Sequence, residues 1–353
     1  MSSVASSTGA DTAGAKQGIA CMLIGMWLFV GQDVLMKELL GAQPLWMLIS
    51  ARALVSAIIL IPLIIWLKGR LYTALWPIHL ARAFLFTTGF TMFYTAFPFM
   101  GLAEVSTIFF SAPLFTALLA VVFLKERLGI HRVAAVFVGF VGVLIAMAPD
   151  AGQFRWVAVL PLICAVFYAA SMILTRRVGD GESSLTMGLW TIGFSGLLIW
   201  PLGYVVNVAL SISPDFHHLR FDFVMPQAWQ WLQLAVLGLV GMGGYILLNR
   251  AYQVANASLI APFDYSYLPF ATLMAWLLWS EVPSSQTIIG MSLIVSAGLY
   301  LGIRELRASR KSEKSAPVGE TVFTTGTPAM AENYDRQWSD GPDGDVQGVI
   351  ESK

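Results

Sequence analysis

Ten long apolar runs follow one another along the chain, and they constrain its fold more than any other feature. They cover residues 18–40, 44–67, 76–98, 103–124, 129–148, 156–175, 185–207, 229–250, 257–280 and 284–303. A helix that crosses a bilayer needs roughly 20 mostly apolar residues, whereas barrel strands would alternate over about ten. The sequence therefore predicts an all-α integral membrane protein with ten transmembrane helices.

Composition excludes several other classes of protein. Hydrophobic residues make up 57% of the chain and charged residues 12%, and the formal net charge is zero. Without a basic surface to neutralise phosphates we expect no nucleic acid as partner. The two cysteines, Cys21 and Cys164, lie inside apolar runs, where small buried side chains are more common than metal ligands. We expect no metal and no cofactor; the expected partners are the lipid bilayer and a small molecule.

Lysine and arginine near the ends of the runs predict the orientation. With both termini on the cytoplasmic side, fifteen of them fall inside and three fall outside, namely Lys37, Arg155 and Arg220. Such an excess marks the cytoplasmic face. We therefore predict a multi-pass membrane protein with both termini cytoplasmic. Residues 1–17 and 308–353 are polar and lack a periodic apolar face, so we expect both to be disordered cytoplasmic segments.

An internal repeat divides the chain into residues 18–148 and 156–303. Both halves carry an Ala-x-x-Ser opening, then a proline and a glutamate: Pro113 precedes Glu126 by 13 residues, and Pro269 precedes Glu281 by 12. Because each half has five spans, the second must be inverted in the membrane. Inverted repeats are typical of secondary transporters. We expect these prolines and glutamates to be structural or gating residues, with each glutamate capping a helix or pairing with a cation.

The same features resemble a known family. Five-plus-five inversion, the paired proline and glutamate helix ends, and the glycine-bearing fifth and tenth helices are similar to the EamA-type branch of the drug/metabolite transporter (DMT) superfamily, over residues 18–305. The stretches "DVLMK" (33–37), "AEVSTIFFSAPLF" (103–115) and "APFDYSYLPF" (261–270) are most similar to bacterial carriers tied to amino acids, riboflavin and S-adenosylmethionine. The resemblance implies alternating access in a bacterial cytoplasmic (inner) membrane and leaves the substrate open.

Asp264 is the acid that most needs an explanation, because a charge at membrane depth costs about 2.5–3.5 kcal/mol. It lies between Pro262 and Pro269, which loosen the helix around it. We expect Asp264, with Tyr265 and Tyr267, to line a transport cavity and to meet a cationic substrate group or carry a proton. The alternative is a structural hydrogen bond to a neighbouring helix.

Two further charges lie within the first two runs. Asp33 is four residues from Lys37, so the two either pair or separate, with Lys37 reaching outward and Asp33 facing the cavity. Arg52 lies deep in the second run, where a guanidinium needs a carboxylate partner or an anionic ligand. Both a structural bridge from Arg52 to Asp33 and a role in binding a substrate carboxylate remain open.

Four other side chains are candidates for binding substrate. Tyr94 in the third run and Tyr245 and Asn249 in the eighth occupy similar places in the two halves and can bind a polar molecule within an apolar wall. Trp27 either stacks on a flat substrate or faces lipid.

The expected function is secondary active transport of a small organic metabolite, such as an amino acid or a related compound. Export is the expected direction, with coupling to protons or plain exchange as the drive, because no nucleotide-binding motif is present. An uptake carrier for riboflavin or S-adenosylmethionine is the alternative. No known catalytic motif is present, so we expect no enzyme, although an embedded enzyme or a lipid-handling protein remain rivals. The oligomeric state stays open, with a homodimer as one option.

Overall fold

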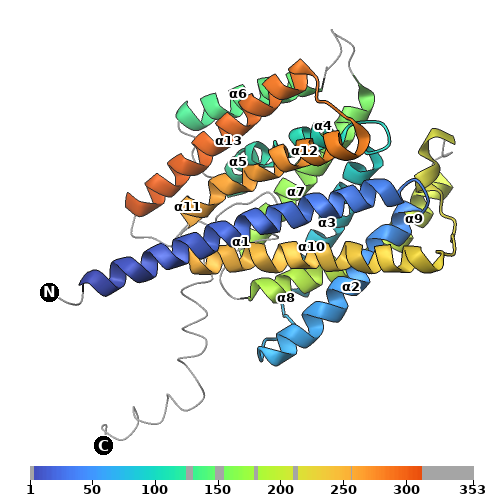
Figure 1. Cartoon of the computed structure of the whole chain (residues 1–353), viewed down its shortest axis with the longest axis horizontal. Helices are drawn as coiled ribbons and strands as arrows, with labels where there is room; N and C mark the ends of the chain where they lie inside the picture. The colour runs from blue at the N-terminus through green and yellow to red at the C-terminus, as the bar shows by residue number, and fades with distance from the viewer. Residues whose placement is uncertain are drawn as a thin grey trace, which may run out of the picture.

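Helices make up every regular element in the described part of the chain. The computed structural model describes residues 4–124, 130–147, 155–178, 182–209, 214–255 and 257–311. The helices are α1 (Val4–Leu39), α2 (Leu45–Trp66), α3 (Trp76–Thr95), α4 (Leu102–Phe109), α5 (Ala112–Leu124), α6 (Ile130–Ala146), α7 (Val159–Val178), α8 (Ser184–Gly188), α9 (Phe194–Ala209), α10 (Ala228–Val254), α11 (Ala257–Ile260), α12 (Tyr267–Trp279) and α13 (Ser285–Lys311) (Figure 1). Short helical turns join some of them, at η1 (Trp156–Ala158), η3 (Leu189–Gly193), η4 (Pro214–Leu219) and η5 (Ala261–Ser266).

Seven helical segments of the described residues are long and apolar enough to cross a membrane. They are Ala15–Leu39, Leu45–Trp66, Leu102–Phe123, Trp156–Thr175, Ser184–Ala209, Ala228–Val254 and Ser285–Arg304. The sequence predicts ten. Of the other three, α6 provides only a shorter apolar stretch, Val133–Ala146, and the segment that ends in α12 is interrupted by η5. The third is α3, which has 20 residues but includes His79, Arg82 and four threonines.

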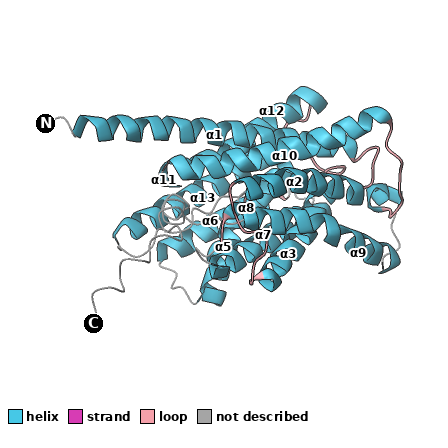
Figure 2. Ribbon diagram, turned by 90° about the horizontal axis from the view of Figure 1, so that it is seen from below, coloured by secondary structure: helices cyan, strands magenta, loops and turns pink. Residues whose placement is uncertain are grey.

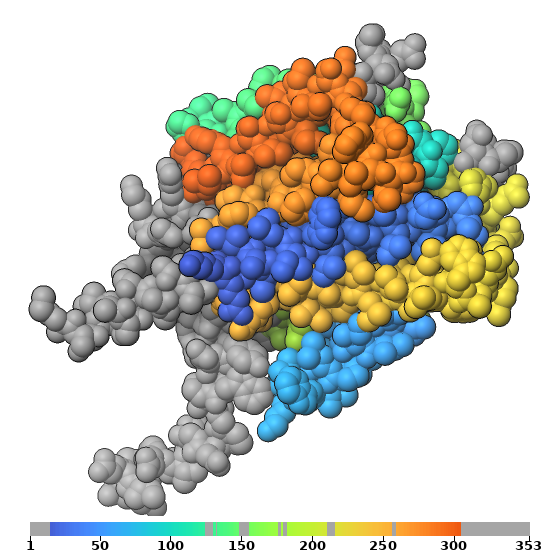
Figure 3. All heavy atoms as spheres, in the orientation of Figure 1, coloured from blue at the N-terminus to red at the C-terminus, as the bar shows by residue number. Residues whose placement is uncertain are grey.

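Three long pairings organise the bundle: α1 packs along α10, α6 along α13, and α3 along α7. Figure 3 shows α1 and α10 side by side on one face of the molecule. The α6–α13 pair is close because of two glycines: a Cβ on Gly290 would lie 2.6 Å from the Gly142 carbonyl oxygen. Small residues at such contacts are typical of helices that pack within a bilayer, where backbones must approach closely.

Two of the membrane-depth segments are broken near a proline. The chain leaves α4 at Phe109 and starts α5 at Ala112, with Pro113 as its second residue; η5 leads into α12, with Pro269 as its third residue. A proline is tolerated in the first turn of a helix, where its missing N–H has no partner anyway. Both prolines therefore begin a helix instead of interrupting one.

The bundle has two ends, which Figures 1 and 2 show with the long helices running between them. The N-terminal end holds the start of α1, the end of α10 and the end of α13; the far end holds the end of α1 and the end of α12. Because α1 begins at Val4, the helix extends through most of residues 1–17, where the sequence predicts disorder; alanines in this segment favour continuation of the helix. Of the C-terminal segment predicted to be disordered, residues 312–353 lie outside the described residues.

Candidate functional site

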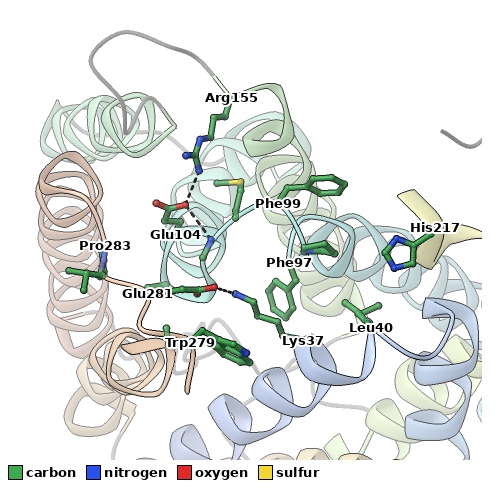
Figure 4. Close-up of a pocket in the computed structure, with 17 residues that line it drawn as sticks. Lys37, Leu40, Phe97, Phe99, Glu104, Arg155, His217, Trp279, Glu281 and Pro283 are labelled. Carbon is green, nitrogen blue, oxygen red and sulfur yellow. Dashed lines mark hydrogen bonds and ion pairs between the residues drawn. The ribbon is translucent and has the colours of Figure 1, made fainter. Parts of the chain in front are cut away.

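A cavity of about 490 Å³ opens at the far end of the bundle, and we call it the far-end cavity. It lies among the end of α1, the start of α4 and the end of α12 (Figure 4). Its lining includes the charged side chains Lys37, Glu104, Arg155 and Glu281. Two of these side chains are basic and two are acidic, so their formal charges cancel.

Glu281 connects three elements in the wall of the far-end cavity. One of its carboxylate oxygens pairs with Lys37, whose ammonium also lies 4.6 Å from the centre of the Trp279 ring. The other accepts a hydrogen bond from the Leu102 N–H at 3.2 Å, which caps the start of α4. Glu281 therefore does both things expected of it, capping a neighbouring helix and pairing with a cation. Its counterpart in the sequence repeat, Glu126, lies outside the described residues.

A buried layer of hydrogen bonds lies deeper in the bundle, centred on Asp33. This carboxylate accepts hydrogen bonds from the Tyr267 hydroxyl at 2.6 Å, from the Tyr94 hydroxyl at 3.1 Å and from the Gln32 amide at 3.1 Å. Ser106 of α4 donates to the Tyr267 hydroxyl at 3.4 Å. We call Asp33, Tyr94, Tyr267 and Ser106 the hub. It joins α1, α3, α4 and α12 with side chains that are all buried.

A second, smaller cavity of about 40 Å³ adjoins the hub, and we call it the deep chamber. Its lining residues are Phe29, Gln32, Asp33, Arg52, Ser56, Phe86, Phe90, Tyr168, Ile192, Gly241, Met242 and Tyr245. One water needs about 10–15 Å³ of such a cavity, so the deep chamber has room for roughly three waters. In this state it is too small for a whole metabolite and suits one small polar group.

Arg52 is the cation of the deep chamber and is 5% exposed. Its Nη1 donates to the Tyr94 hydroxyl at 2.9 Å, and its guanidinium lies 5.8–5.9 Å from the ring centres of Phe86, Phe90 and Tyr94. Among the described residues, the link between Arg52 and Asp33 therefore runs through the Tyr94 hydroxyl and not through a direct ion pair.

The hub lies between the two cavities. On α1, Asp33 lines the deep chamber, and Lys37, one helical turn further along, lines the far-end cavity. On α3, Phe90 lines the deep chamber and Phe97, just beyond the helix, lines the far-end cavity, with Tyr94 between them in sequence. Both helices place the layer of hydrogen bonds at the boundary that a molecule passing from one cavity to the other must cross.

A polar network closes the bundle on the other side of the deep chamber, toward the N-terminal end. Glu182, in the short connection between α7 and α8, binds the Thr73 hydroxyl with one oxygen and His79 Nε2 with the other, at 2.7 Å. His79 Nδ1 lies 3.1 Å from Arg82 Nη1. His79 and Arg82 are fully buried. We call these four residues the N-terminal seal.

Tyr245 connects the N-terminal seal to the deep chamber. Its hydroxyl donates to the Ser184 carbonyl at 2.6 Å, two residues beyond Glu182, while the same side chain lines the chamber. Asn249, one turn along α10, is buried and donates to the Tyr245 carbonyl at 2.8 Å, and it lines neither of the two cavities. The structure therefore brings Tyr245 into the site and leaves Asn249 outside it.

Asp264 and Tyr265 do not line either of these cavities. Asp264 is buried within η5, so it faces the protein interior and not lipid. The Tyr265 hydroxyl points at Gly298 of α13. Trp27 is 41% exposed on the side of α1 and packs edge-on against Phe270 at 4.8 Å. Of the candidates from the sequence, the structure brings together Asp33, Arg52, Tyr94, Tyr245 and Tyr267.

Neither the residues of the N-terminal seal nor Gln32 was singled out from the sequence. His79 and Arg82 are three residues apart on one helix face, a spacing that signals an interaction. Nothing in the sequence links them to Glu182, which is 103 residues from His79. Gln32 fits against α10 because position 241 is glycine. A Cβ there would collide with Oε1, the side-chain amide oxygen of Gln32.

Burial shifts the pKa of two groups in the connections between helices. It raises the pKa of the Glu182 carboxyl above its ordinary value, although nearby Arg82 acts in the opposite direction. It lowers the pKa of His218, close to the far-end cavity, to about 4, and neighbouring His217 adds to the effect. His218 is therefore neutral at physiological pH.

One family matches the chain twice. It is described as the EamA-like transporter family, and the matches cover residues 16–148 and 155–302. A solved structure, described only as a crystal structure of protein, has a TM-score of 0.53 with this chain at 18% identity, covering 85% of this chain and 99% of the other. At that identity it supports the fold alone.

Similar curated proteins are named as transporters. A riboflavin transporter of Vibrio cholerae is 28% identical over 67% of this chain and 75% of its own length. An S-adenosylmethionine uptake transporter of Rickettsia bellii is 26% identical over 83% of this chain and 96% of its own length. A pseudopaline exporter of Pseudomonas aeruginosa is 24% identical over 81% of this chain and 96% of its own length.

Proposed function

The chain belongs to the EamA-like transporter family and is a multi-pass membrane protein, and from this premise we propose that it is a secondary active transporter. It moves a small organic metabolite across a bacterial cytoplasmic membrane by alternating access. The far-end cavity, the hub and the deep chamber form the path. The hub and the N-terminal seal are the two barriers that open in turn.

The proposed architecture has ten spans in two inverted five-helix repeats, over residues 18–148 and 156–303, with both termini in the cytoplasm. Pairs of helices exchange as such a repeat requires. The first span packs on the eighth (α1 on α10), and the sixth packs on the third (α7 on α3). The fifth packs on the tenth (α6 on α13). Exchanging the two halves turns the fifth span into the tenth and the tenth into the fifth, so this pair is its own counterpart. This packing supports the inverted repeat, in which two halves alternate in opening.

One observation carries the proposal: a buried carboxylate, Asp33 of the first half, is hydrogen-bonded by Tyr267 of the second half at the boundary between two cavities. An acid at membrane depth is expensive and marks a pathway for a substrate or a proton. Because Tyr94 of the first half and Tyr267 of the second hold the same carboxylate, any movement of the halves must change its surroundings. Asp33, Arg52, Tyr94, Tyr245 and Tyr267 are the proposed substrate-facing residues.

The direction of transport rests on less. Relatives named as S-adenosylmethionine uptake transporters favour import, and one named as a pseudopaline exporter favours export. Export, expected from the sequence, stays a prediction, as does coupling to protons. We propose no enzymatic activity, and the transporter names of the relatives support this.

Counterflow in proteoliposomes tests the proposed function. Liposomes holding the full-length chain are loaded with an unlabelled amino acid, riboflavin or S-adenosylmethionine, and uptake of the labelled compound is followed from either side. We expect the wild type to exchange at least one of them and Asp33→Asn to lower the rate at least about tenfold. Asp222→Asn, an exposed acid in a connection between helices, is the matched control and should exchange normally. No exchange with any compound, or unchanged exchange by Asp33→Asn, would contradict the proposal.

A further inference from the structure

Arg52 has hydrogen-bonding capacity that the described protein groups do not use. The side chain is 95% enclosed, yet its Nε has no hydrogen-bond partner among the described residues. Within the described part of the chain, its one hydrogen bond goes from Nη1 to the Tyr94 hydroxyl, which is a neutral acceptor. A buried guanidinium with five donors and a single neutral acceptor is an unusual arrangement, because burying a charge without a partner is costly.

The carboxylate that lines the same chamber, Asp33, makes no ion pair with Arg52 within the 4 Å that defines one among the described residues. Asp33 already accepts three hydrogen bonds, from Tyr267, Tyr94 and Gln32, and these hold it in the hub. Aromatic rings surround part of the guanidinium and stabilise the positive charge, but they accept no directed hydrogen bond in its plane. The unused edge of Arg52 therefore has room for an acceptor that the described part of the chain does not supply.

The deep chamber provides the space for that acceptor. Arg52 lines it together with Ser56, which lies one turn further along α2 on the same helix face. The Ser56 hydroxyl can donate a second hydrogen bond to the same ligand. The volume of about 40 Å³ suits a group of a few heavy atoms. The planar fork of a guanidinium matches a carboxylate, with which it can form two parallel hydrogen bonds.

Charge balance narrows the ligand further. Asp33 and Arg52 are linked through one hydroxyl and together carry no net charge. A bare anion added to this buried pair would leave one uncompensated negative charge in a low-dielectric site. A ligand that brings its own cation adds no net charge, and the rings of Phe29 and Tyr168 in the chamber wall offer faces for that cation.

We propose that Arg52 is the specificity-determining residue of the deep chamber and binds the carboxylate of a zwitterionic metabolite, the chemistry of an amino-acid head group. This inference rests on the proposed transport function and names its substrate class. The head group enters the chamber, and the remainder of the ligand occupies space that opens as one end of the bundle moves. Neutral ring systems without a carboxylate, such as flavins, lack the group that Arg52 requires.

Binding is tested first, on the purified full-length chain in detergent, by the rise in melting temperature. The compounds are the common amino acids, S-adenosylmethionine and riboflavin. Each acid that stabilises the chain is compared with a form that lacks the carboxylate, such as L-methioninamide for L-methionine or decarboxylated S-adenosylmethionine for the parent. We expect the acid to reach half-saturation at a concentration at least about tenfold lower than its carboxylate-free form does. A tenfold difference is the size expected for a hydrogen bond to a charged group.

The variants assign the preference to Arg52. Arg52→Gln should remove the difference between acid and carboxylate-free form, and Arg52→Lys should keep part of it, because an ammonium retains the charge but not the fork. Arg250→Gln, an exposed arginine of α10, is the matched control and should keep all of it. Should Arg52→Gln not fold, the ratio measured in the wild type and in Arg52→Lys decides.

Failure of this inference can be told apart from failure of the transport proposal. The inference is overturned if no acid stabilises the chain, if acid and carboxylate-free form act at equal concentration, or if Arg52→Gln keeps the preference. Counterflow of the same compounds then tests transport separately. An acid that binds through Arg52 but is not exchanged contradicts transport alone, and exchange without any preference for a carboxylate contradicts the role of Arg52 alone.

Discussion

The two ends of the bundle use similar polar residues in different degrees of burial. At the far end, Glu281 and Arg155 remain 31% and 41% exposed and border an open cavity of about 490 Å³. At the N-terminal end, His79 is fully buried against Glu182, which is 13% exposed. The same kinds of side chain therefore border an open cavity at one end and close the path at the other.

In the proposed alternating-access cycle, this difference corresponds to a state that is open at the far end and closed at the N-terminal end. Alternating access requires that one end be closed while the other is open. With the far-end cavity open, a substrate still has to pass the hub to reach the deep chamber. In the opposite state the N-terminal seal must separate while the far end closes around Lys37, Glu104 and Glu281.

Removing a donor from the hub has the largest expected effect, because both ends meet there. Tyr267→Phe deletes the 2.6 Å hydrogen bond to the buried Asp33 carboxylate. A hydrogen bond to a charged group is worth about 1.5–3 kcal/mol, so we expect counterflow to fall by roughly 10- to 150-fold. Tyr204→Phe, on an exposed tyrosine of α9, is the control. Equal rates for the two variants would show that the hub is not a barrier.

A variant that weakens the closed N-terminal end should make it more accessible to water, as the far end already is. Tyr245→Phe deletes the 2.6 Å hydrogen bond to the buried Ser184 carbonyl, and the loss of one neutral hydrogen bond costs about 0.5–1.5 kcal/mol. In a background without Cys21 and Cys164, we expect a thiol reagent to label Ser184→Cys up to about tenfold faster.

The same helix supplies the control for that measurement. Tyr252 is also buried on α10, and its hydroxyl has no hydrogen-bond partner among the described residues. Tyr252→Phe should therefore leave the labelling rate of Ser184→Cys unchanged. A similar increase in both variants would mean that the rate reports general loosening of α10.

Lowering the pH should close the N-terminal end further, with a smaller effect than the substitutions above. Burial in the closed N-terminal end raises the pKa of the Glu182 carboxyl, so the closed state binds a proton more tightly than a state in which Glu182 is in water. Protonation therefore stabilises closure. Labelling of Ser184→Cys should slow as the pH falls below the raised pKa and speed up as the pH rises through it. Rates are taken relative to Asp222→Cys at an exposed position, because every thiol labels faster as it ionises. On this scale Glu182→Gln should be flat, and the opposite slope in the parent chain would contradict the assignment.

The far end should contribute least. The Lys37–Glu281 pair borders an open cavity, and pairs within reach of water are worth about 1 kcal/mol or less. A double-mutant cycle combines Lys37→Met and Glu281→Gln and measures the free energy of unfolding of each variant by thermal unfolding. We expect a coupling free energy of this size between the two side chains, and a smaller one at high salt. A coupling of several kcal/mol would mean that this end is locked as firmly as the other.

The sequence predicted the all-helical membrane class because run length determines where a helix can cross a bilayer. Of the ten spans it predicted, seven helical segments of the described residues are long and apolar enough to cross. It also singled out Asp33, Tyr94 and Tyr267, since polar groups at that depth need an explanation. It placed Asp264 at the centre of the site because prolines flank it, but the structure buries Asp264 in η5 outside both cavities described. Helix periodicity shows which face a residue shares, not which distant helix covers that face.

Pairings between distant segments were beyond reach for the same reason. Lys37 is 244 residues from Glu281, and His79 is 103 residues from Glu182. The sequence left two alternatives for Lys37, a pair with Asp33 four residues away or a side chain that reaches outward, and it could not name Glu281 as the partner. The structure separates them: Lys37 reaches the far-end cavity, and Asp33 turns inward to the tyrosines.

Thiol accessibility at both ends, measured together, tests the central claim most directly. Single cysteines replace Ala103 in the wall of the far-end cavity and Ser184 behind the N-terminal seal, each in a cysteine-free chain in liposomes. Labelling of both is followed at one pH across salt and added substrate. Alternating access predicts opposite changes, so that any condition that exposes Ser184→Cys protects Ala103→Cys. Rates that rise and fall together, or that vary independently, would contradict it.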